Sequence, residues 1–100
     1  MAIIYANETN FNETINTKNI VIVDFFANWC GPCKMLSPML EEIDNENIVI
    51  LKVDVDSNPE IANKYKIMSI PTIILFKNGM EKSKKIGLCS KQELEEMINQ

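Results

Sequence analysis

Along the chain, segments with the apolar pattern of a strand alternate with segments that have the apolar pattern of a helix. Three runs are apolar at nearly every position, as is typical of strands buried on both faces of a sheet: residues 19–27, 47–55 and 70–77. A short apolar segment at residues 3–5 predicts an edge strand, and Asn78–Gly79 predicts a hairpin into a lysine-rich edge strand at residues 81–87.

Helical patterns lie between these runs. Asn10 and Glu13 are spaced like a capping pair and predict a helix that ends near Thr17. Asn58 is expected to cap a short helix that has Pro59 at its first position.

Two longer helices complete the pattern. Residues 34–44 are predicted as an amphipathic helix kinked at Pro38. Its predicted buried stripe consists of Met35, Leu36, Met39, Leu40 and Ile43. Ser90 and Glu93 form a capping box for a final helix at residues 90–100. The resulting order, β-α-β-α-β-α-β-β-α, predicts an α/β fold with a mixed sheet.

Composition narrows the possible classes of protein. One hundred residues at 46% hydrophobic fit a single domain, residues 1–100. The net charge of −4 and the lack of a basic stripe argue against a nucleic-acid partner. The N-terminal residues show no signal peptide, and the longest apolar run is broken by Asp24, so we expect a cytoplasmic protein without a membrane partner.

Cys30 and Cys33 directly follow the first central strand, with Gly31 and Pro32 between them. In the cytoplasm a structural disulfide is disfavoured, so this spacing indicates a metal ligand pair or a redox pair. A structural metal site usually needs four Cys or His ligands, but the chain has three cysteines and no histidine, so we expect no metal.

The position of the two cysteines favours redox chemistry. A helix that begins at Cys30 would stabilise its thiolate, and a spacing of three residues puts Cys33 on the same helical face, within disulfide reach. We therefore expect an exposed, reactive Cys30 beside a buried Cys33. The alternative is a pair of reduced cysteines with only a structural role.

Asp24 interrupts an otherwise apolar strand. Burying an unpaired carboxylate is unfavourable, so Asp24 is expected to be largely neutral, or to bond to water or to Lys52. As a buried group near the cysteines it could transfer protons. The alternative is a bulge or a solvent-facing turn of the strand.

Several motifs then occur together in one order. They are WCGPCK, VDFFA upstream of it, and KVDVDSNP, SIPT and FKNG downstream. In this order and spacing the chain resembles the thioredoxin family over nearly its whole length. The resemblance implies the thioredoxin fold: a five-stranded mixed sheet of order 1-3-2-4-5, with its last two strands antiparallel to their neighbours, flanked by four helices.

The resemblance also implies roles for particular residues. Cys30 would attack client disulfides and Cys33 would resolve the mixed disulfide, while Asp24 would transfer protons to and from Cys33 with Lys52 as its charged neighbour. Pro71 would be a cis proline facing the disulfide, and Ile70 would offer its backbone to an extended client. The rest of the docking surface would be Trp29, Gly31, Pro32 and Gly87.

Two features depart from the family pattern. Phe26 stands where many thioredoxins have tryptophan, which would leave Trp29 as the source of fluorescence. The N-terminal segment is short, which could weaken the first strand. Neither departure touches the cysteine chemistry.

Cys89 precedes Ser90 and is spaced to pack on Leu94 as a hydrophobic staple, a role that needs no reactivity. The alternative is a regulatory thiol near the docking surface.

The function expected from these features is cytoplasmic reduction of protein disulfides by a monomer, with disulfide-containing proteins as clients. No GxGxxG pattern is present, so no cofactor is expected and a separate thioredoxin reductase would regenerate the dithiol. One alternative is a rigid binding module with incidental cysteines, although a scaffold would not need the cysteines, Asp24 and Ile70–Pro71 together. The other is a disulfide oxidase or isomerase, which is disfavoured by the absence of a signal peptide and by Gly31–Pro32, a dipeptide that resembles that of the reducing members of the family.

Overall fold

The computed structural model describes residues 2–17, 19–43 and 45–100. Its nine elements follow the predicted order, with the bounds β1 (Ala2–Tyr5), α1 (Phe11–Ile15), β2 (Ile20–Phe26), α2 (Gly31–Glu41), β3 (Ile48–Asp54), α3 (Pro59–Lys64), β4 (Thr72–Lys77), β5 (Met80–Ile86) and α4 (Lys91–Ile98). The predicted end of the second helix at Asp44 lies outside the described residues, and α2 ends three residues earlier, at Glu41.

The five strands form one mixed sheet in the order β1-β3-β2-β4-β5, which confirms the predicted order. β3 is parallel to β1 and β2, whereas β4 is antiparallel to β2 and to β5. Strand β2 therefore lies in the middle of the sheet, paired along its length on both sides. Its C-terminal end leads to the cysteines, so the central strand of the sheet positions the reactive segment.

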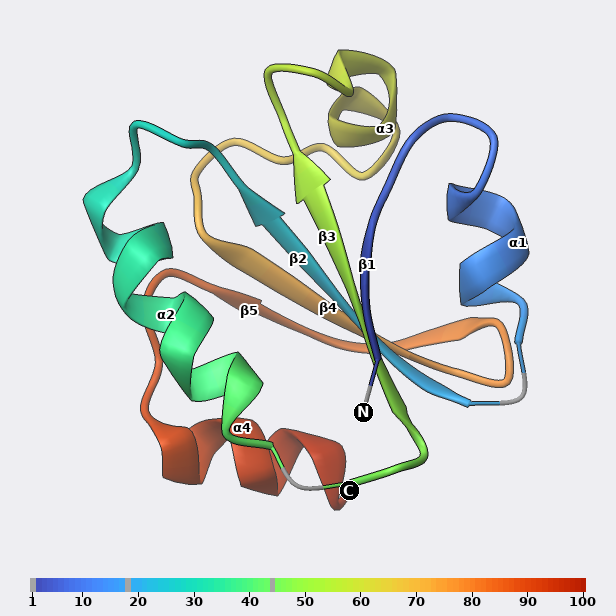
Figure 1. Ribbon diagram of the computed structural model, residues 1–100, viewed down its shortest axis with the longest axis vertical. Coiled ribbons are helices and arrows are strands. Elements are labelled where there is room, and N and C mark those ends of the chain that lie inside the picture. The colour runs from blue at the N-terminus through green and yellow to red at the C-terminus, as the bar shows by residue number, and fades with distance from the viewer. Residues whose placement is uncertain (1, 18, 44) are drawn as a thin grey trace.

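Alternating side chains of the strands form a core on each face of the sheet. Helices α1 and α3 cover one face, and α2 and α4 cover the other (Figure 1). In β2, Val21, Val23 and Phe25 point toward α1 and α3, while Ile22 packs beneath α2 and α4. Because side chains alternate along a strand, Asp24 lies on the same face as Ile22, under α2.

The buried stripe of α2 is narrower than predicted. Leu36 and Leu40 are fully buried, Met39 and Ile43 are partly buried, and Met35 is 62% exposed, so the prediction for Met35 was wrong. Cys33, Leu36 and Leu40 already fill the helix face that meets the sheet. Met35 precedes Leu36 by about 100° around the helix axis, which turns it to the solvent.

The predicted caps had different outcomes. The capping box of Ser90 and Glu93 is present with both of its hydrogen bonds, at 3.1 Å each, which confirms the prediction for α4. Asn10 and Asn58 occupy N-cap positions, but neither side chain caps its helix. The Asn10 Oδ1 accepts from the Asn7 N–H, and the Asn58 amide donates to backbone carbonyls, so both side chains brace loops instead.

Within the described ranges, the longest helix has 11 residues, and none has the length and hydrophobicity that a membrane crossing requires.

Candidate active site

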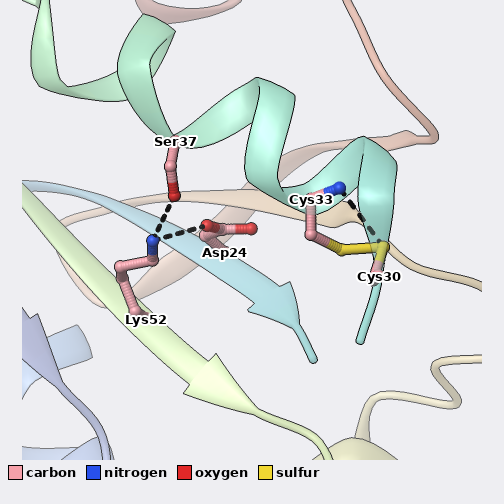
Figure 2. Close-up of polar contacts among 5 residues, drawn as sticks. All are labelled: Asp24, Cys30, Cys33, Ser37 and Lys52. Atoms are coloured by element: carbon pink, nitrogen blue, oxygen red, sulfur yellow. Dashed lines mark hydrogen bonds and ion pairs between the residues drawn. A yellow bond between two sulfur atoms is a disulfide. The ribbon is translucent and has the colours of Figure 1, made fainter. Parts of the chain in front are cut away.

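Cys30 and Cys33 form a disulfide at the N-terminus of α2, with their Cα atoms 5.3 Å apart (Figure 2). Cys30 is the N-cap residue, in an extended conformation, and Gly31 and Pro32 are the first two helical residues. The Cys30 Sγ accepts a hydrogen bond from the Cys33 N–H at 3.2 Å. The sulfur therefore lies at the positive end of the helix, where backbone N–H groups stabilise negative charge.

Both cysteines of the disulfide are buried. Cys30 is 5% exposed and Cys33 is 4% exposed, so the expectation of an exposed Cys30 was wrong for the disulfide form. Both pack with Ala27, and the partly buried Ile70 lies against them. Ile70 therefore forms a border of the disulfide on this side.

The segment before β4 supplies this border. The Ile70–Pro71 peptide bond is cis, as the family resemblance implied, and the Ile70 carbonyl oxygen lies 3.8 Å from the Cys30 Sγ. The Gly87 N–H donates to the Pro71 carbonyl at 2.8 Å, and Gly87 has a φ of +88°, a conformation that favours glycine. These contacts bring Ile70, Pro71 and Gly87 together beside the disulfide.

Trp29 lies next to the same border. Its side chain is 71% exposed, and its Nε1 donates to the Asp56 Oδ2 at 2.8 Å, which fixes the indole ring. An open groove of about 190 Å³ lies beside it, lined by Trp29, Val55, Ile67, Met68, Ser69 and Ile70. No lining residue carries a charge, so the groove favours apolar groups of a bound chain.

Asp24 and Lys52 are adjacent residues in the register of β2 and β3. The Asp24 side chain is 1% exposed, and its Oδ2 lies 3.8 Å from the Lys52 Nζ (Figure 2). Neither carboxylate oxygen has a hydrogen-bond partner in the part of the chain that the structure describes. The burial predicted for Asp24 is confirmed, and the alternative of a solvent-facing turn is wrong.

Burial dominates the electrostatics of Asp24. It raises the pKa of this carboxyl to about 6, although the Lys52 ammonium acts in the opposite direction. A cavity of about 170 Å³ lies beside the pair, and both Cys33 and Lys52 line it. In Figure 2 the Asp24 carboxylate projects between the Lys52 ammonium and the Cys33 side chain. Asp24 can therefore exchange a proton near neutral pH close to Cys33.

Cys89 lies on the same face of the sheet, in the core beneath α4. It is buried in a cluster with Leu94, as the staple arrangement predicts. Burial raises the pKa of its thiol, and Glu93 adds to this effect. A buried thiol with a raised pKa is a poor nucleophile, so the structure favours a packing role for Cys89.

Two contacts of the site were absent from the sequence prediction. One is the bond from Trp29 to Asp56, and the other is a hydrogen bond of 2.5 Å between the Lys52 Nζ and the Ser37 Oγ. Ser37 lies four residues after Cys33 and so on the same helical face, but no local pattern indicated its contact with Lys52, 15 positions away. Asp56 likewise had no local signal, because it contacts a residue 27 positions away.

The chain matches the family model described as Thioredoxin over residues 2–100. A thioredoxin of Staphylococcus haemolyticus is 45% identical over 99% of this chain and 97% of that protein. Thioredoxins of Bacillus subtilis and Rickettsia typhi are 43% and 50% identical, over 99% and 88% of this chain and 97% and 87% of theirs.

A solved structure of a mutant thioredoxin from Halobacterium salinarum is also similar. It superposes with a TM-score of 0.90 at 31% sequence identity, over 98% of this chain and 88% of that one. The predicted fold is therefore confirmed at the level of the whole chain.

Proposed function

The chain belongs to the thioredoxin family, whose members are thiol–disulfide oxidoreductases, and from this premise we propose that it is a general protein-disulfide reductase. Cys30 is the attacking nucleophile and Cys33 the resolving thiol. The observation that carries this assignment is the position of the Cys30 Sγ, which caps α2 and accepts from the Cys33 N–H. In the reduced protein the same contact stabilises a thiolate on Cys30 and not on Cys33.

The reaction proceeds in two exchanges. The Cys30 thiolate attacks one sulfur of the client disulfide, which forms a mixed disulfide and releases the other client sulfur as a thiolate. Cys33 then loses its proton and attacks the Cys30 Sγ, which forms the Cys30–Cys33 disulfide and releases the second client sulfur. The client gains two electrons, and the cysteine pair loses two.

Asp24 serves the second exchange. Its carboxylate accepts the proton that leaves the Cys33 thiol, with Lys52 as the adjacent charge. The support is the burial of Asp24, its pKa of about 6 and the cavity shared by Cys33 and Lys52. A group with this pKa is largely ionised at neutral pH and can take up the proton.

Clients dock as extended segments along the border described above. The backbone of Ile70 offers hydrogen-bonding groups beside the Cys30 Sγ, as in strand addition. This contact is surrounded by Trp29, Gly31, Pro32, Pro71 and Gly87. The apolar groove beside Trp29 receives apolar side chains of the client.

We assign the protein to the cytoplasm, because a disulfide reductase needs a compartment that keeps thiols reduced. We also propose that it acts as a monomer. A separate thioredoxin reductase regenerates the dithiol.

The order of attack can be tested with single cysteine variants in a Cys89→Ala background, which removes the third thiol. Cys33→Ser should accumulate a mixed disulfide with the client on Cys30, detected by mass spectrometry, because the resolving thiol is missing. Cys30→Ser should form none and should not reduce clients.

Alkylation gives an independent measure of the same assignment. In the reduced protein, iodoacetamide at neutral pH should modify Cys30 faster than Cys33, because the helix N-terminus stabilises the thiolate of Cys30. Faster modification of Cys33, together with trapping by Cys30→Ser, would reverse the two roles.

A further inference from the structure

The Lys52 ammonium has two polar neighbours of different kinds. Its Nζ lies 2.5 Å from the neutral hydroxyl of Ser37, but 3.8 Å from the Asp24 carboxylate. The ring of Phe26 lies on another side, with its centroid 5.0 Å from the Nζ. The ammonium is thus held at hydrogen-bond distance from a hydroxyl and beyond that distance from an opposite charge (Figure 2).

This arrangement leaves the carboxylate poorly neutralised. The bond to Ser37 joins the ammonium to a neutral hydroxyl, whereas a bond to Asp24 would join it to an opposite charge, so the electrostatic attraction alone would draw Lys52 toward Asp24. Among the described residues, neither Asp24 oxygen has a hydrogen-bond partner. The Ser37 hydroxyl therefore competes with Asp24 for the Lys52 ammonium.

The fold explains why these groups meet. The register of β2 and β3 places Asp24 beside Lys52 on the face beneath α2. Ser37 follows Cys33 by about one helical turn, so both project from α2 toward this pair. Cys33 and Ser37 also line the cavity that Lys52 lines.

We propose that Ser37 is a positioning residue: its hydroxyl holds the Lys52 ammonium away from Asp24 and so keeps this carboxylate a stronger proton acceptor toward Cys33. The inference rests on the proposed function for its consequence in turnover, but not for its electrostatic part. In the resolving step the Cys33 S–H bond breaks and an O–H bond forms on Asp24. The Cys33 thiolate then attacks Cys30, and the client leaves as a thiolate.

Among the described residues around Asp24, Lys52 makes the charged contact. On β4, the residue paired with Asp24 in register is Ile73, which is apolar. The titratable or charged groups that face this site are Tyr5 from β1, Lys52 from β3, Cys33 and Lys34 from α2, and Cys89 before α4. Of these, the Lys52 ammonium makes the ion-pair contact with Asp24 in the described part of the chain.

The test is a titration of the Asp24 carboxyl carbon by NMR in wild-type protein and in Ser37→Ala. Without the hydroxyl, Lys52 should move to hydrogen-bond distance from Asp24. The pKa of Asp24 should then fall by about one pH unit, since an opposite charge in contact typically lowers a carboxyl pKa by about 1–3 units. Ser37→Thr keeps the hydroxyl and should titrate like wild type.

A second background shows whether Ser37 acts through Lys52. In Lys52→Met the ammonium is absent, so adding Ser37→Ala should leave the pKa of Asp24 unchanged. An equal shift in this background, or no shift from Ser37→Ala in wild type, would overturn the proposal. The NMR titration does not depend on turnover, so it separates this outcome from a failure of the proposed reductase activity. If both hold, Ser37→Ala should also reduce disulfides more slowly at neutral pH.

Discussion

Asp24→Asn should make the protein more stable at neutral pH, and this gain should disappear in acid. Asparagine keeps the shape of the buried carboxyl group but cannot ionise, so it isolates the effect of the charge. Burial raises the pKa of Asp24 from 3.8 to about 6 in the folded protein. Between these values the folded protein holds a proton that the unfolded chain has released, so stability falls as pH rises.

The magnitude follows from the difference between the two pKa values. At a pH below the pKa of Asp24 in the unfolded chain, the carboxyl group is protonated in both states and its charge does not affect stability. At a pH above its pKa in the folded protein, the group is ionised in both states and the full loss of stability applies. The pKa of Asp24 rises by roughly two on folding. At about 1.4 kcal/mol for each pKa unit, this rise lowers the free energy of unfolding by about 3 kcal/mol. This is a large share of the stability of a small domain, which is typically about 5–15 kcal/mol.

Urea unfolding of wild type and Asp24→Asn at several pH values would measure the effect. The free-energy difference should be near zero in acid and should rise to a plateau of about 3 kcal/mol above neutral pH. Glu41→Gln is a matched control, because Glu41 is an exposed carboxylate at the end of α2 and its removal should not reproduce this curve. A gain that is the same at every pH, or a less stable variant at neutral pH, would refute the electrostatic account of Asp24.

Two further predictions concern the start of α4. Ser90→Ala removes the side-chain acceptor of the capping box and should lower the free energy of unfolding by about 1 kcal/mol, measured by urea melts; an unchanged stability would show that the cap contributes nothing here. Cys89→Ala should keep wild-type reductase activity, and Cys89 in the native reduced protein should react with iodoacetamide far more slowly than Cys30, because burial raises the pKa of the Cys89 thiol whereas the N-terminus of α2 stabilises the thiolate of Cys30. Loss of activity in Cys89→Ala would instead support the regulatory role.

Patterns local in sequence predicted most of the fold. The continuous apolar runs identified β2, β3 and β4, because strands buried on both faces have few polar positions. The capping box of Ser90 and Glu93 was also predictable, since its two hydrogen bonds join residues three apart. Family resemblance, and not periodicity, supplied the strand order and the cis bond at Pro71.

Contacts that depend on tertiary packing were not predictable from these patterns. Met35 belongs to an apolar cluster in sequence but lies off the narrow face that meets the sheet. The Asn58 side chain does not cap α3, and its amide donates instead to the carbonyl of Ala6, 52 positions away. The bond from Lys52 to Ser37 joins α2 to β3 across 15 residues, and only the packing of the helix on the sheet brings the two together.

Catalysis of disulfide reduction tests the central claim most directly. A model protein disulfide such as that of insulin would be reduced by dithiothreitol with and without a small molar fraction of this protein, and with Cys30→Ser as control. The account predicts many turnovers per molecule of wild type and the uncatalysed rate with Cys30→Ser. Folded wild-type protein whose Cys30–Cys33 disulfide dithiothreitol reduces, but which leaves the rate of client reduction unchanged, would contradict it.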